Sequence, residues 1–135
     1  MAFLTWNDDY LVGVRSLDNQ HSVLFNLLNE LHAAMLNGQA RNRAVLILRN
    51  LLNYTRGHFS TEEAMMASAG YPGLDRHRIQ HRGLTKHVQE FEARFERGEG
   101  ALNPQLFGFL RDWLTNHIQD ADKEYGLWLN QKGVQ

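Results

Sequence analysis

The chain has 135 residues, of which 43% are hydrophobic, and this length suits one domain with a substantial buried core. Its formal net charge of -1 and its pI near 6.6 give no electrostatic reason to expect nucleic acid or an anionic membrane as a partner. The absence of cysteine excludes disulfides, thiolate zinc sites and thiolate-held iron–sulfur clusters. No apolar run approaches the roughly 20 residues of a membrane span, and residues 1–10 do not resemble a secretory signal. We therefore expect a cytoplasmic protein that does not enter a membrane.

Residues 1–17 are predicted to form an N-terminal arm ahead of the first helix. The arm carries large apolar side chains, including Phe3, Trp6, Tyr10 and Val14, and is too apolar to extend freely into solvent. We expect it to pack across one end of the domain.

Four helices are predicted after the arm, because apolar residues recur there at spacings of three and four. Asp18 is a suitable N-cap for the first helix, and Asp75 for the third. Asn103 and Pro104 have the sequence of an N-cap followed by a first-turn proline, which begins the fourth. The predicted helices cover about residues 18–37, 41–69, 75–97 and 104–130.

Helices of similar length joined by short loops favour antiparallel neighbours. The predicted fold is therefore all-α: an up-down-up-down antiparallel four-helix bundle with the arm packed against it. No strand-like alternation appears beyond residue 17, and we interpret residues 1–135 as a single domain.

Histidine and carboxylate residues recur at helical spacing on all four predicted helices. In an up-down-up-down bundle, these positions lie toward one end and face inward with the apolar stripes. Unpaired burial of each such charge costs on the order of several kcal/mol, whereas a shared metal cluster satisfies them together. Five imidazoles and two carboxylates are too many for one ion but suit two. The candidate ligands are His21, His58, Glu62, His77, His81, His117 and Asp122.

Asp122 is the least certain member of this set. It follows His117 by five residues, which is a rotation of about 140° on an ideal α-helix. Either the side chain reaches around the helix, or the helix is locally overwound or bulged, and Asp120 is a competing carboxylate. His32 is interpreted as a histidine at the edge of the core, and His87 as a solvated or flanking residue.

Imidazole and carboxylate ligands suit iron, manganese, zinc or copper better than calcium or magnesium. The chain has no His-Glu-x-x-His motif, so a zinc-protease interpretation has no support. No glutamate stands three residues before a histidine, unlike in the ferritin-like di-iron proteins.

The ordered motif His21, His58-x3-Glu62, His77-x3-His81 and His117-x4-Asp122 resembles the complete ligand signature of the hemerythrin family, especially its bacterial members. The resemblance extends over nearly the whole chain. It implies two iron ions joined by an oxo or hydroxo bridge, and it favours Asp122 over Asp120.

The resemblance also implies a role for each ligand. His77, His81 and His117 correspond to the ligands of a coordinatively saturated iron, and His21 and His58 to those of an iron with an open position. Glu62 and Asp122 correspond to the bridging carboxylates. Dioxygen would bind at the open iron as hydroperoxide.

Apolar residues near the ligands in helical terms are candidates for a dry oxygen pocket, which would keep out water and protons. Leu114 and Ile118 also match pocket positions of the family, and Tyr71 and Tyr125 match family tyrosines that support the ligands. The candidate pocket residues are Leu114, Ile118, Trp113, Phe25 and Phe59.

Two classes of function stay open on the sequence. The first is reversible binding of dioxygen, or of another small diatomic gas, in oxygen transport, storage or sensing by a monomer. The second is a di-iron redox enzyme, such as an oxidase, peroxidase or nitric oxide reductase, or a protein that works with an unidentified oxidase or reductase. The lack of an extra glutamate at bridging spacing favours the binding protein. A structural zinc or manganese site is a further alternative.

Overall fold

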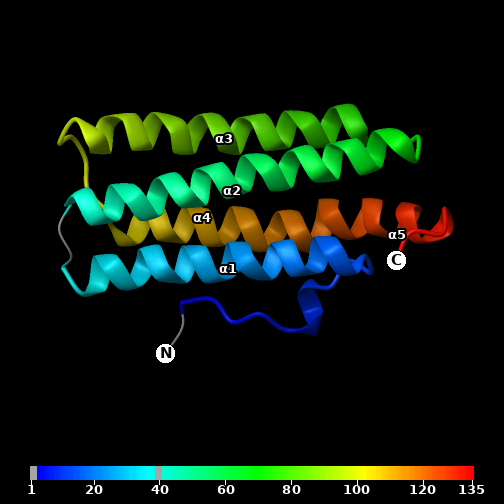
Figure 1. The fold of residues 1–135 in the computed structure, drawn as a ribbon, viewed down its shortest axis with the longest axis horizontal. Coiled ribbons are helices and arrows are strands. Elements are labelled where there is room, and N and C mark those ends of the chain that lie inside the picture. Colours follow the sequence, from blue (N-terminus) through cyan, green and yellow to red (C-terminus); the bar gives the residue numbers. More distant parts are fainter. Residues whose placement is uncertain (1–2, 39–40) are drawn as a thin grey trace.

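The computed structural model describes residues 3–38 and 41–135, and all of the regular structure there is helical (Figure 1). The elements are η1 (Asp8–Tyr10), α1 (Arg15–Leu36), α2 (Arg41–Ser68), α3 (Leu74–Glu96), α4 (Pro104–His117), η2 (Ile118–Asp122) and α5 (Lys123–Gln131). The last three follow one another without a break and form one long rod, the fourth rod (Figure 1). The helices α1, α2 and α3 are the other three rods. Successive rods run in opposite directions, so the predicted antiparallel four-helix bundle is confirmed (Figure 1).

The helices bury the apolar stripes that predicted them. Leu17, Leu24, Leu28 and Leu31 of α1 are each at most 3% exposed. They lie on one side of the helix because residues three and four apart share a face. The other helices contribute similar stripes, and together they form a core that runs the length of the bundle.

The helix starts differ partly from the predicted caps. Asn103 does cap α4, since its side-chain oxygen accepts from the Leu106 N–H at 2.8 Å and Pro104 occupies the first turn. Asp18 instead lies one turn inside α1, where its carboxylate accepts from the Val12 N–H at 2.7 Å. It therefore joins the arm to the helix rather than capping it.

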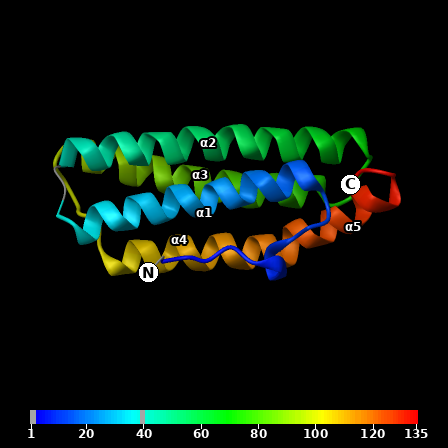
Figure 2. The same cartoon turned by 60° about the horizontal axis from the view of Figure 1, so that its bottom comes forward.

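The arm packs on the bundle, but it runs lengthwise beside α1 and the fourth rod instead of only crossing one end (Figures 1 and 2). Leu4 exchanges two hydrogen bonds with the Asn29 side chain, at 2.7 and 2.8 Å. The Phe3 ring stacks on His32 and meets Phe107 of α4 edge-on. An extended segment covers about 3.3 Å per residue, so the apolar side chains of the arm are spread over a long distance. They can all be buried only if the arm follows the long axis of the bundle.

Two glycines allow the arm to approach the fourth rod closely. A side chain at Gly126 would collide with the Val12 carbonyl oxygen. Gly13 has a φ of 87°, which side chains disfavour, and its carbonyl accepts from the Asn130 amide at 2.9 Å. The arm is thereby fixed beside the end of the bundle that holds the clustered histidines.

Within residues 3–38 and 41–135, no helix combines the length and apolar character needed to cross a membrane.

Candidate metal centre

The seven candidate ligands converge inside the bundle from all four rods. Each of them is at most 8% exposed, and Glu62 and His21 are completely buried. The helical periodicity brings them to one layer, because each replaces an apolar residue in an inward-facing stripe. They are His21 of α1, His58 and Glu62 of α2, His77 and His81 of α3, and His117 and Asp122 of the fourth rod.

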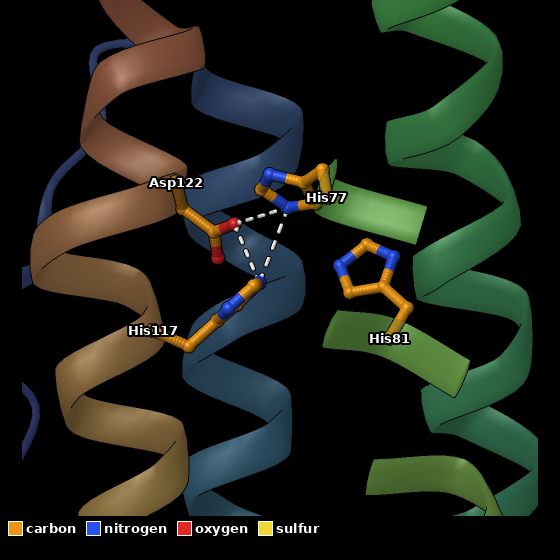
Figure 3. A group of neighbouring side chains, drawn as sticks. All are labelled: His77, His81, His117 and Asp122. Carbon is orange, nitrogen blue, oxygen red and sulfur yellow. Dashed lines mark hydrogen bonds and ion pairs between the residues drawn. The ribbon is translucent and has the colours of Figure 1, made fainter. Parts of the chain in front are cut away.

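The ligand atoms fall into two groups, and in each group they lie within 4.8 Å of one another. The first, the three-histidine group, is His77, His81, His117 and Asp122, and Figure 3 shows their side chains turned toward a common centre. The second, the two-histidine group, is His21, His58, Glu62 and Asp122. Such groups have the composition and spacing of transition-metal sites.

Both carboxylates contact histidines of both groups. The Asp122 oxygens lie 3.2 Å from His21 Nε2, 2.9 Å from His77 Nε2 and 3.1 Å from His117 Nε2. The Glu62 oxygens lie 3.2 Å from the Nε2 atoms of His21 and His58, and 3.3 Å from His81 Nε2. Their position between the groups suits carboxylates that bridge two metal ions.

Asp122 reaches the cluster because the fourth rod bulges beside it. Residues Ile118–Asp122 form a π-helical turn, in which the Lys123 N–H donates to the Ile118 carbonyl, five residues back. A π turn returns to the same face after about one residue more than an α turn, so Asp122 faces the same centre as His117. Of the two arrangements that the sequence leaves open, the bulge is the one observed. Asp120 is exposed.

The buried polar atoms fit a bound cation. Among the residues that the structure describes, four buried side-chain atoms make no hydrogen bond: His21 Nδ1, Glu62 Oε1, His81 Nε2 and Asp122 Oδ1. Three of these face the centre of the cluster, where imidazole nitrogens and carboxylate oxygens meet at about 3 Å. Buried polar groups are normally satisfied, so these lone pairs favour metal coordination.

The electrostatics of the cluster point the same way. Burial lowers the pKa of His21, but hydrogen bonds and charge from Asp122 and Glu62 outweigh it and raise that pKa from 6.5 to about 10. Burial raises the pKa of Glu62, but the charge of His58 and the hydrogen bond with His21 hold it well below its usual range. Burial and the charge of Glu62 likewise raise the pKa of Asp122. His117 and His21 outweigh both effects, so this pKa lies below its usual range. Both carboxylates are therefore ionised at neutral pH.

Three contacts behind the ligands were not predicted or were predicted only in part. Gln20 Oε1 lies 2.6 Å from His58 Nδ1, and Glu63 Oε2 lies 2.9 Å from His81 Nδ1. Gln20 directly precedes His21 in the sequence, and Glu63 directly follows Glu62. Their position beside a candidate ligand did not indicate which histidine on another helix each would contact. The hydroxyl of Tyr125, expected as a supporting residue, donates to Glu62 Oε2.

An apolar cavity of about 40 Å³ has two rings in its wall that stack on candidate ligands, although no candidate ligand lines it directly. Three predicted pocket residues, Phe59, Trp113 and Leu114, line it. The Phe59 ring stacks on His81 at 3.6 Å, and the Trp113 ring stacks on His117 at 4.4 Å. The remaining walls include Leu24, Leu28, Thr55, Leu84, Val88 and Leu110, each from a position one or two turns along its helix from a ligand. Sequence reasoning missed these residues, which resembled ordinary core.

The other predicted residues lie elsewhere. Phe25 and Ile118 are buried but do not line the cavity. Phe25 faces the arm, where Trp6 and Tyr10 pack edge-on against its ring. The Tyr71 ring packs against the rings of Tyr125 and Trp128.

The hemerythrin HHE cation binding domain matches residues 12–129. The chain belongs to the hemerythrin family. The bacteriohemerythrin of Pseudomonas aeruginosa strain LESB58 is 36% identical over 127 residues, covering 93% of this chain and 80% of the relative. That of Methylococcus capsulatus is 34% identical over 127 residues, covering 93% of this chain and 96% of the relative.

A solved hemerythrin structure has the same fold. The crystal structure of wild-type hemerythrin superposes with a TM-score of 0.90 at 33% identity, and the match covers 95% of this chain and 98% of the other. The sequence resemblance to hemerythrins is thus confirmed by family, relatives and fold, and the two buried clusters agree with a two-metal site in this family.

Proposed function

We propose that this hemerythrin-family chain binds dioxygen reversibly at a di-iron centre. The observation that carries the proposal is the unequal number of histidines in the two ligand groups, which have Asp122 in common, while Glu62 contacts histidines of both. With Glu62 and Asp122 shared, the two-histidine group offers one imidazole fewer than the three-histidine group. An iron held by His21 and His58 would therefore keep a position for a small ligand, while an iron held by His77, His81 and His117 would be more nearly filled.

The cavity supports a small, uncharged ligand. Its volume of about 40 Å³ exceeds the roughly 10–15 Å³ that one water needs, and its walls are largely aliphatic and aromatic. An iron pair would supply the electrons that dioxygen takes up on binding and returns on release. Phe59, Trp113 and Leu114 would exclude the water and protons that make such oxidation irreversible.

Gas binding is tested by loading the metal-free protein with ferrous iron under nitrogen, admitting air and then removing the oxygen. We expect two irons per chain and a visible absorption band that disappears on deoxygenation and returns with air. His77→Ala should reduce the iron content, whereas His87→Ala, at an exposed position of the same helix, should not.

Other outcomes separate the alternatives. Permanent bleaching with release of peroxide, or sustained turnover with an added reductant, would favour a di-iron redox enzyme. Binding of no more than one metal per chain would overturn the di-iron centre itself.

A further inference from the structure

We propose that Glu63 is a positioning residue of the metal centre: it fixes which nitrogen of His81 carries the proton and strengthens that imidazole as a ligand. This inference rests on the proposed metal centre, but not on the identity of the gas. Glu63 follows the candidate ligand Glu62 in α2, and its side chain turns to α3 instead of into the cluster.

The contact determines the tautomer of His81. Glu63 Oε2 lies 2.9 Å from His81 Nδ1. An ionised carboxylate can only accept a hydrogen bond, so Nδ1 must carry the hydrogen. The lone pair is then on Nε2, which is buried, lies 3.3 Å from Glu62 Oε1 and makes no hydrogen bond within residues 3–38 and 41–135. Glu63 therefore aims an electron pair at the place where a metal would bind.

Two neighbours hold this arrangement in place. The Phe59 ring stacks on His81 with an interplanar angle of 2°, which fixes the plane of the imidazole. Glu63 fixes the rotation within that plane by its contact with the outer edge. Its second oxygen accepts from Arg78 Nε at 3.3 Å, and this shared use of both oxygens orients the carboxylate.

Among the residues that the structure describes, no carboxylate contacts the Nδ1 atom of either histidine in the two-histidine group. His58 Nδ1 faces the neutral amide oxygen of Gln20 at 2.6 Å, and His21 Nδ1 makes no hydrogen bond with any residue the structure describes. A carboxylate behind a ligating imidazole raises its basicity, while an amide does so less. Glu63 thus adds to the difference between the two groups, because it makes His81 of the three-histidine group a stronger electron donor to a metal.

The experiment compares Glu63→Ala, which removes the acceptor, and Glu63→Gln, which keeps a neutral acceptor, with wild type. The matched control is Glu90→Gln, which removes the same charge at an exposed position of α3. Zinc affinity is measured by competition with a chelator, and the imidazole nitrogen shifts of the metal-free protein are recorded by ¹⁵N NMR. Neither measurement involves dioxygen, so failure of gas binding would leave this test intact.

We expect Glu63→Ala to weaken zinc binding by about 10- to 100-fold and to mix the two tautomers of His81. Glu63→Gln should fall between Ala and wild type while retaining the wild-type tautomer, and Glu90→Gln should match wild type. Wild-type affinity and tautomer in Glu63→Ala would overturn the proposal. If Glu63→Ala loses helical content, Glu63→Gln decides, and wild-type zinc affinity in that variant would overturn the role of the charge.

Discussion

His117 Nε2 lies 3.1 Å from Asp122 Oδ1, across a turn of helix that is one residue longer than usual. The π turn at Ile118–Asp122 lets two side chains five residues apart act at one centre. The same carboxylate contacts His21 on α1 and His77 on α3, and it is thereby the common member of both ligand groups.

Replacement of this shared carboxylate should affect both metal positions. We expect Asp122→Ala to bind at most one iron per chain, because each group loses a ligand, as measured by metal analysis of the reconstituted protein. Asp120→Asn removes a charge from an exposed position of the same turn and should leave two irons bound. Equal loss of iron in both variants would indicate a general charge effect rather than ligation.

The cavity wall should control oxidation more than iron binding. Leu114 is part of the wall and belongs to none of the ligand groups. Leu114→Ala should therefore keep both irons but autoxidise several-fold faster, because the enlarged cavity admits water. The measurement is the decay of the oxygenated absorption band in air. Leu127→Ala, at a position 66% exposed, is the control, and an unchanged decay rate in Leu114→Ala would remove this residue from the barrier.

The Tyr125 hydroxyl should stabilise the metal-free fold. Burial and the nearby carboxylates raise the pKa of Tyr125 well above its usual value, so the hydroxyl remains a donor to Glu62 at neutral pH. Tyr125→Phe leaves a buried carboxylate without this donor, which should lower the free energy of unfolding by about 1.5–3 kcal/mol. Urea unfolding of the metal-free protein measures the change. Tyr54→Phe, at a half-buried position, should have a smaller effect, and equal changes would contradict a specific role.

Metal binding should release protons at neutral pH. The pKa of His21 in the folded protein, about 10, lies above its ordinary value of 6.5. Its contribution to stability is therefore fully present below pH 6.5 and is lost as the pH rises through about 10. Between these values the metal-free protein holds a proton on His21 that a metal must displace. Calorimetric titration with zinc in buffers of different ionisation enthalpy should detect this release at pH 8, and buffer-independent heats would contradict it.

The carboxylates give the opposite pH dependence. The pKa values of Glu62 and Asp122 are depressed, so their contribution to the stability of the metal-free protein is present above the ordinary carboxylate range and is lost as the pH falls below it. The metal-free protein should consequently be less stable in acid and in strong base than near pH 6. Thermal unfolding across this range measures both limits.

The sequence by itself determined the architecture and the convergence of the seven candidate ligands. Apolar residues at spacings of three and four specify helices and their inner faces, and short loops make neighbouring helices antiparallel. His77 and His81 continue the stripe of Leu84 and Val88, so their inward orientation was implied by local periodicity. Asn103 and Pro104 specified a helix start through capping chemistry that depends on no distant residue.

Only the tertiary structure decided how residues on different helices contact one another. The bulge before Asp122, the path of the arm and the pairing of Glu63 with His81 depend on contacts between segments far apart in the chain or on small helix rotations. Periodicity gives the face of a residue but not its partner across the bundle. Phe25 and Phe59 both lie near ligands in their helices, yet one packs under the arm and the other lines the cavity. That difference arises because the arm occupies one side of α1, while the cavity is lined by residues of all four rods.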